Sequence, residues 1–128
     1  MGDDIMSARL IAGIGLRAGA CLADLEALLA LAPAPVAGLA TLSDKAGHAA
    51  LRELCDKTAL PLTPIAGQAI AGIPTPTRSP DQIARFATGS LAEACALVAA
   101  GTGARLLGPR LVCPNGRATI AFAERKPL

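Results

Sequence analysis

The sequence predicts a single-domain α/β protein with three layers, in which helices cover both faces of a mixed sheet of about five strands. Short apolar segments alternate with amphipathic helical segments through most of the 128 residues. An Asn-Gly turn joins the last two apolar segments, which predicts an antiparallel hairpin after an otherwise parallel sheet. We therefore expect one domain over residues 1–128, with an ordered core at about 9–123.

The first half of the chain reads as strand, helix, strand. Residues 9–14 (RLIAGI) form an apolar run that ends at Gly15, as in a buried strand. A helical stripe follows and stops before two prolines. Its members are Leu22, Leu25, Leu28 and Leu29. Residues 36–42 (VAGLATL) then predict a second buried strand.

The middle of the chain predicts a second helix, an edge strand and an exposed loop. Asp44 is expected to cap a helix whose apolar stripe includes Leu51 and Leu54. Residues 60–65 contain two prolines, which an edge strand tolerates. The proline-rich residues 72–80 predict a stiff surface loop.

Two helix starts and a hairpin are predicted in the second half. Ser79 precedes Pro80 and places Gln82 at the third helical position. Ser90 and Glu93 have the spacing of a second capping box, before an apolar face over residues 91–98. The final strands, at residues 111–113 and 118–123, are expected to pair around Asn115-Gly116.

Composition excludes several classes of function. The chain has a net charge of +2, two Phe, no Trp and no Tyr, so it lacks the basic surface and stacking side chains of nucleic-acid-binding proteins. No apolar run is long enough to span a membrane. Met1 to Asp4 are acidic rather than basic, unlike a secretory signal. The four cysteines form no Cys-x-x-Cys pair and are expected to be small buried residues, so we expect a cytoplasmic protein without a metal site.

Candidate ligand-binding residues follow the predicted strands and open the predicted helices. In open α/β sheets, ligands bind beyond the carboxyl ends of strands and at helix N-termini. Segments 15–19 and 41–45, the helix start 88–90 and the loop around Ser79 supply hydroxyls, amides and cations that suit a ligand with several carboxylates. Gly13, Gly15 and Gly19 are spaced one residue too widely for a dinucleotide fingerprint, and His48 has no adjacent nucleophile. No cofactor is expected.

Four motifs in this order give the chain a family resemblance. GIGLRAG (13–19), LATLSDK (39–45), IPTPTRSPDQIARFATGSLAEACAL (73–97) and LLGPRLV (106–112), with the final TIAFA (119–123), resemble the family formed by CobE and the C-terminal domain of CbiG. The family belongs to cobalamin (corrin) biosynthesis, and the resemblance extends over about residues 9–123. The chain is similar to the stand-alone form, because the additional N-terminal regions of CbiG are absent.

The resemblance implies a precorrin or corrin intermediate as partner, with other enzymes of the pathway as further partners. CbiG opens the lactone ring of a cobalt-precorrin and releases a two-carbon fragment, so a hydrolase is one expectation. A non-catalytic carrier or partner module is the alternative. If the protein is an enzyme, Lys45 and Glu93 are the candidate proton carriers.

The motif positions, together with the helix starts, imply a set of substrate-binding residues. These are Gly13, Gly15, Arg17, Thr41, Lys45, Ser79, Thr88, Gly89, Ser90 and Arg110. Leu16 and Ala18 depart from the family pattern, whereas Arg110 preserves a cation where the family often has Lys. Several of these residues have a structural alternative. Ser79 and the Ser90–Glu93 pair can serve only as helix caps, the two glycines can serve only close packing, and Thr41 can bond locally.

Overall fold

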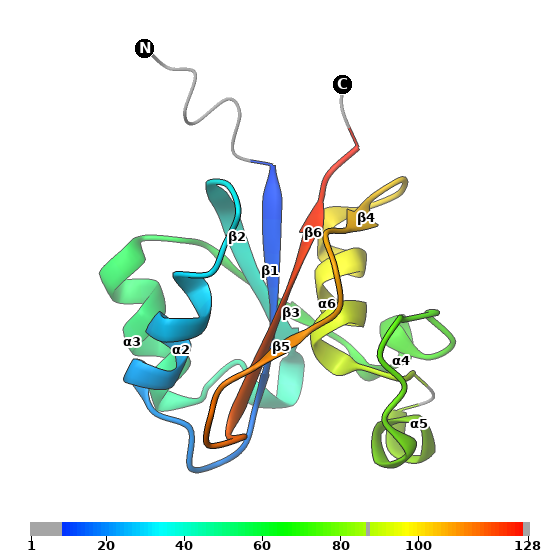
Figure 1. The fold of residues 1–128 in the computed structure, drawn as a ribbon, viewed down its shortest axis with the longest axis horizontal. Coiled ribbons are helices and arrows are strands. Elements are labelled where there is room, and N and C mark those ends of the chain that lie inside the picture. Colours follow the sequence, from blue (N-terminus) through cyan, green and yellow to red (C-terminus); the bar gives the residue numbers. More distant parts are fainter. Residues whose placement is uncertain (1–8, 87, 127–128) are drawn as a thin grey trace.

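The fold is a mixed sheet of six strands with helices on both faces (Figure 1), as described over residues 9–86 and 88–126 of the computed structural model. The strands are β1 (Leu10–Leu16), β2 (Val36–Leu42), β3 (Leu62–Ile65), β4 (Arg105–Leu106), β5 (Leu111–Val112) and β6 (Ala118–Glu124). Their order is β3-β2-β1-β6-β4, and β5 also pairs with β6. The predicted mixed α/β class is confirmed. The strand that the sequence did not predict is β4, which has two residues.

Strand directions place the final hairpin beside the first strand. β1 is parallel to β2, and β2 is parallel to β3 at the sheet edge. β6 is antiparallel to β1, with Ala118 opposite Leu16. The predicted hairpin is confirmed, because Leu111 pairs with Ile120. The start of β6 and the ends of β1 and β2 consequently share one end of the sheet.

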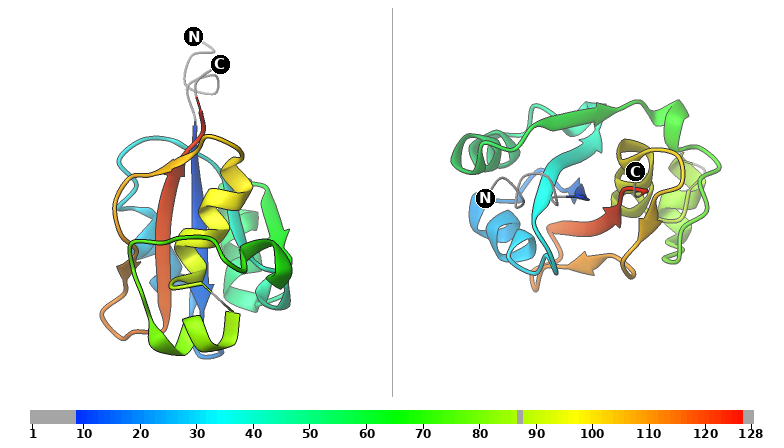
Figure 2. Two further views of the ribbon diagram at one scale, coloured as in Figure 1. Left: turned by 90° about the vertical axis from the view of Figure 1, so that its right-hand side faces the viewer. Right: turned by 90° about the horizontal axis from the view of Figure 1, so that it is seen from above.

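The helices form the two outer layers. α2 (Leu22–Leu29) and α3 (Ala49–Thr58) lie together on one face of the sheet, and α6 (Leu91–Ala100) lies on the other (Figure 2). The short helices α4 (Gly67–Ile70) and α5 (Pro80–Phe86) lie on the α6 side, and a 3-10 turn, η1 (Ser43–Lys45), follows β2. The three-layer arrangement is therefore confirmed.

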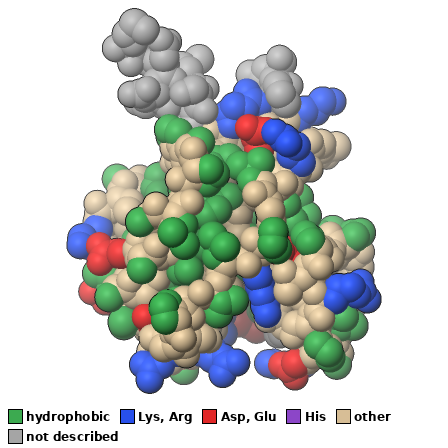
Figure 3. Space-filling model, viewed as in Figure 1, with side chains coloured by type: hydrophobic (Ala, Val, Ile, Leu, Met, Phe, Trp, Pro, Cys, Tyr) green, Lys and Arg blue, Asp and Glu red, His purple; other side chains and the backbone are tan. Residues whose placement is uncertain are grey.

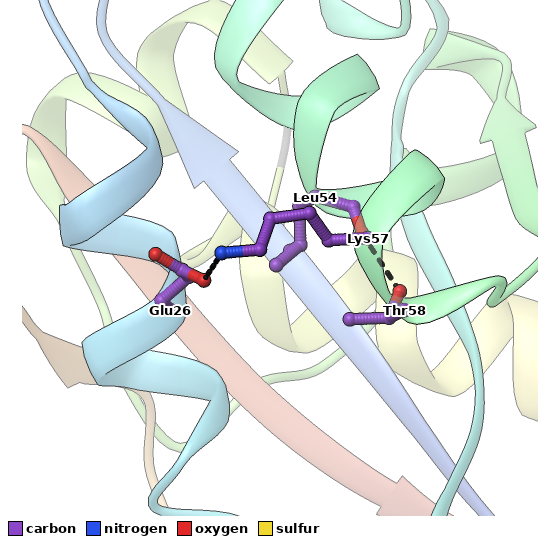
Figure 4. A network of polar contacts seen from close by, with 4 residues as sticks. All are labelled: Glu26, Leu54, Lys57 and Thr58. Carbon is purple, nitrogen blue, oxygen red and sulfur yellow. Dashed lines mark hydrogen bonds and ion pairs between the residues drawn. The ribbon is translucent and has the colours of Figure 1, made fainter.

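Polar contacts join α2 and α3 at their outer surface (Figure 4). Lys57 reaches across from α3, and its Nζ lies 2.7 Å from Glu26 Oε2 on α2. The Thr58 hydroxyl donates to the Leu54 carbonyl within α3. Because both partners of the ion pair are largely exposed, it adds little to stability, and the packing of the two helices rests on their apolar sides.

The two sides of the sheet carry different packing. Leu10, Ile14 and Ile120 belong to the larger cluster under α2 and α3. On the opposite side Gly13 lies against α6, where a Cβ would clash with the Ala92 carbonyl oxygen and with Ala96. The small residues of α6 thus let the helix approach β1 closely, and Gly13 serves that approach.

Two predictions about local structure are wrong. Asp44 lies in η1 and does not cap α3; His48 does so, because its Nδ1 accepts the Ala50 N–H at 3.2 Å. Among the free cysteines, Cys21 is exposed at the start of α2 rather than buried. Cys95 and Cys113 are buried as expected, and burial raises the pKa of Cys95 to about 12.

The segment Met1 to Asp4, whose acidic character entered the sequence analysis, lies outside the described residues. Within the described residues, none of the helices combines the length and apolar character needed to span a membrane.

Candidate functional site

A cleft lies at the end of the sheet where β1 and β2 finish and β6 begins. Its volume is about 720 Å³. The lining residues are Gly15, Leu16, Arg17, Ala18, Leu42, Lys45, Ser79, Asp81, Gln82, Arg85, Leu91, Arg110, Val112, Gly116, Arg117, Ala118 and Thr119. This is the edge at which open α/β sheets bind ligands.

The cleft is strongly cationic. Arg17, Lys45, Arg85, Arg110 and Arg117 line it, against the single carboxylate of Asp81. Figure 3 shows Lys and Arg side chains gathered along the lower edge of the molecule, the end at which β1 finishes in Figure 1. A polyanionic ligand would meet a concentrated positive potential there.

Most of these cations form no ion pair within the described part of the chain. Arg85 lies 3.8 Å from Asp81, one helical turn away on α5. Among the described residues, no carboxylate lies within 4.0 Å of the side-chain nitrogens of Arg17, Lys45, Arg110 or Arg117. These four side chains can therefore bind external carboxylates without first breaking an internal ion pair.

Apolar side chains form part of the cleft lining, beside the polar and charged ones. Leu16, Leu42, Leu91 and Val112 contribute this apolar part. Gly15 pairs with Thr119 across the two central strands, and a Cβ at Gly15 would press against the Thr119 hydroxyl. The absence of a side chain at Gly15 therefore leaves room for the Thr119 hydroxyl between the two strands.

Backbone and side-chain hydrogen bonds fix the loop that carries Arg17. The Arg17 N–H donates to the Arg117 carbonyl at 2.8 Å. The Nε2 of His48 lies 3.1 Å from the carbonyl oxygens of both Arg17 and Ala18. Because carbonyls only accept and Nδ1 already accepts from Ala50, we assign the neutral tautomer with the proton on Nε2.

A second, shallower hollow of about 340 Å³ adjoins the cleft beyond Lys45. It is lined by Ala18, Asp44, Lys45, His48 and Ala49. Ala18 and Lys45 belong to both, so the hollow extends the larger cleft toward α3.

The cleft unites Gly15, Arg17, Lys45, Ser79 and Arg110, half of the predicted substrate-binding residues. Their roles as ligands remain predictions. Ser79 also caps α5, with its hydroxyl 3.5 Å from the Gln82 N–H. The Gln82 side chain does not return to Ser79; instead it accepts the Leu91 N–H at 2.8 Å and joins α5 to α6.

The other half of the set is buried behind the cleft. These residues are Gly13, Thr41, Thr88, Gly89 and Ser90. The Thr41 hydroxyl donates to the Ile14 carbonyl and the Thr88 hydroxyl to the Ile73 carbonyl. A Cβ on Gly89 would clash with the Thr77 carbonyl. Ser90 accepts the Glu93 N–H at 3.4 Å, so its side chain caps α6 as predicted.

Glu93, the second candidate proton carrier, is also buried behind the cleft. Its side chain has no exposed surface. The carboxylate does not bond to the Ser90 N–H, as a full capping box requires; it accepts from the Thr77 N–H and hydroxyl and from the Arg110 N–H. Lys45 is therefore the one of the two candidates that lines the cleft.

Sequence reasoning missed Arg85 and Arg117 as parts of the cleft. Arg117 follows the Asn-Gly turn, which the sequence did reveal, but its place depends on β6 pairing with β1. The signal that could have found it is the direction of an antiparallel last strand, which returns its first residues to the carboxyl end of the first strand. Within the described residues, no cluster of three or more His, Cys, Asp or Glu side chains is arranged to hold a metal ion.

Comparison with known families decides the relationship. The family model "Cobalamin synthesis G C-terminus" (CbiG_C) matches residues 10–123. The chain belongs to this family. It is accordingly a protein of cobalamin biosynthesis, as the four motifs predicted.

Solved structures agree with membership in the CbiG_C family. CobE, a protein from the cobalamin (vitamin B12) biosynthetic pathway, is 30% identical with a TM-score of 0.76, over 92% of this chain and 91% of CobE. Cobalamin biosynthesis protein chiG from Agrobacterium tumefaciens strain C58 is 33% identical with a TM-score of 0.70, over 92% of this chain and 99% of that chain.

A more distant structure shares the fold alone. A cobalamin biosynthesis protein G homolog from Sulfolobus solfataricus is 16% identical with a TM-score of 0.68, over 93% of this chain and 37% of that chain. A search among curated proteins found no match.

Proposed function

We propose that the cleft binds a precorrin or corrin intermediate of cobalamin biosynthesis through the carboxylates at the rim of its macrocycle. The observation that carries the proposal is the grouping of Arg17, Lys45, Arg110 and Arg117 around one cleft, with no carboxylate of the described residues within 4.0 Å of their side-chain nitrogens. Corrin intermediates combine an apolar ring with peripheral acetate and propionate groups, which matches a cleft whose apolar side chains adjoin several cations.

The size and shape of the cleft support this ligand class. Small-molecule sites typically enclose about 300–1,000 Å³. The cleft has about 720 Å³ and continues into the hollow beside Lys45. Guanidinium groups bind carboxylates in paired hydrogen bonds, so the three arginines would also orient the ring.

The arrangement favours binding without catalysis. Glu93 is occupied by three donors and is fully buried, and Asp81 pairs with Arg85. The function that we favour is thus to carry or present an intermediate to other pathway enzymes. The free cysteines support a reducing, cytoplasmic setting for this role.

Lactone opening is the second candidate, and the position of Lys45 favours it. Lys45 lines the cleft, and its ammonium group could donate a proton to the alkoxide released when water cleaves the lactone C–O bond. Incubation with a lactone-bearing precorrin, followed by product mass and acetaldehyde assay, tests this candidate. Turnover by the wild type that is lost in Lys45→Met would support lactone opening. No turnover above the buffer control would contradict lactone opening and favour the carrier function.

The binding proposal is tested by titration with cobyrinic acid, a corrin whose side-chain carboxylates are free. Its fully methylated ester is the matched control, because it has the same ring and no side-chain charge. We expect binding of the acid, weaker binding at high salt and little binding of the ester. Equal binding of acid and ester, or no binding of either, would contradict the proposal.

A further inference from the structure

Glu93 occupies a position that helix formation alone does not explain. It is at the third residue of α6, where the Ser90 hydroxyl already caps the helix by accepting the Glu93 N–H. Its own side chain makes no bond to the start of α6; it points to two loops. Full burial of a carboxylate is costly unless several donors surround it, so the donors identify what this residue does.

The three donors come from two separate segments of the chain. The Thr77 N–H and hydroxyl each lie 2.9 Å from a carboxylate oxygen, and the Arg110 N–H lies at 2.6 Å. Thr77 belongs to the proline-rich loop before α5, and Arg110 belongs to the turn before β5. One side chain thus joins two loops that are distant in sequence.

Both loops supply residues to the cleft. Ser79 follows Thr77 by two residues and lines it, and the Arg110 side chain lines it directly. Neither loop has regular secondary structure at these positions, so their placement depends on the few hydrogen bonds that they make. Fixing them is what the buried carboxylate can do for a ligand that it does not touch.

We infer that Glu93 is a positioning residue, which holds the Ser79 loop and the Arg110 turn at the spacing that the cleft needs for a polycarboxylate ligand. The inference rests on the proposed function for its ligand. It replaces the role of proton carrier that the sequence predicted for Glu93. An apolar residue of similar volume could fill the same space, but it would leave the donors of both loops without this common acceptor, which costs stability.

The test uses Glu93→Gln, which keeps the shape of the side chain and replaces one acceptor oxygen with a donor. At least one of the three donors then loses its partner. The Thr77 and Arg110 amides bond to different carboxylate oxygens, so hydrogen exchange by NMR should become faster at one or both of them and remain slow at amides in the middle of α6. Glu53→Gln on the exposed face of α3 is the control for the same chemical change. Unchanged exchange at both loop amides would overturn the inference.

Binding of cobyrinic acid provides the second measurement. Glu93→Gln should weaken it by on the order of ten-fold in the wild-type chain. In an Arg110→Ala background the same substitution should have much less effect, because the side chain that it positions is gone. If Glu93 had a merely structural role, Glu93→Gln would weaken cobyrinic acid binding equally in both backgrounds. That result would overturn the inference.

Two further outcomes separate the inference from the proposed function. If Glu93→Gln does not fold, Thr77→Val removes only the hydroxyl donor and should give the same pattern at smaller amplitude; unchanged binding and exchange in that variant would overturn the inference.

If the wild-type chain itself does not bind cobyrinic acid, the proposed function fails, and the positioning role fails with it. If the wild type binds and Glu93→Gln binds equally well, the positioning role alone fails.

Discussion

The backbone N–H of Arg17 donates to the carbonyl oxygen of Arg117 at 2.8 Å, which joins the loop after β1 to the turn before β6. The two arginines come from opposite ends of the described chain, yet this bond places them on one rim of the cleft. Their cooperation follows from the antiparallel pairing of β6 with β1.

The first prediction concerns these two guanidinium groups. Arg17→Ala and Arg117→Ala should each weaken cobyrinic acid binding by about 1–3 kcal/mol, because each removes a charged hydrogen-bond donor to carboxylate. Isothermal titration calorimetry measures the loss. Arg52→Ala, on the exposed surface of α3 and outside the cleft, is the control for loss of one positive charge. Unchanged affinity in both cleft variants would refute the assignment of the rim.

A second prediction separates the two roles of His48. His48→Ala should destabilise the protein by about 1 kcal/mol, since α3 loses its N-cap. His48→Asn restores a good cap, but its shorter side chain does not reach the carbonyls of Arg17 and Ala18. We expect near-native urea midpoints for His48→Asn together with weaker ligand binding. If Asn restored both properties, the contact to the Arg17 loop would have no role in binding.

The third prediction is a pH dependence at Asp24. The Cys21 N–H lowers the pKa of this carboxyl from its ordinary value of 3.8; partial burial opposes the shift, while Asn115, the Cys21 thiol and Arg117 add to it. A lowered pKa in the folded state means that Asp24 stabilises the fold above pH 3.8, and that this contribution is lost as the pH falls through the folded-state value.

Asp24→Asn isolates this contribution. Urea midpoints of the wild type and the variant should differ at pH 7 and converge at a pH below 3.8, because protonation removes the same charge from the wild type. A constant difference across that range would contradict the assignment. Since Asn115 donates to Asp24 at 2.9 Å, the variant should also loosen the turn that carries Arg117.

The fourth prediction tests the packing of α6 on β1. Gly13→Ala places a Cβ against the Ala92 carbonyl and Ala96, so the helix must move away, at a cost of about 1–3 kcal/mol. Gly47→Ala is the matched control, because nothing lies within 4 Å of a Cβ at that exposed position. Thermal denaturation of the two variants gives the comparison. Equal stabilities would show that α6 does not depend on the glycine.

Features with local causes were predictable from the sequence. Ser79 and Ser90 cap their helices because a hydroxyl at that position meets an N–H three residues later, whatever the rest of the fold does. The strand at residues 36–42 and the hairpin around Asn115 are likewise set by short-range pattern. The edge placement of β3 was expected from its prolines.

Features that depend on long-range pairing were not predictable. Glu93 has the sequence position of a capping-box acid, but its side chain accepts from the amides of Thr77 and Arg110, which lie 16 and 17 residues away. Arg117 enters the cleft only through the register of β6 on β1. His48 replaces Asp44 as a cap because the chain first forms a 3-10 turn, which delays the start of α3.

The order of strands also has a consequence during synthesis. Among the strands of residues 9–86 and 88–126, β6 is made last and lies beside β1, which is made first; β6 carries β4 and β5 on its other side. As the polypeptide leaves the ribosome, β1, β2 and β3 can pair early, but the flank of β1 stays open until residues 118–124 have emerged. The nascent chain therefore cannot assemble its binding surface in stages, and a stalled or shortened translation product would expose an unpaired central strand prone to aggregation.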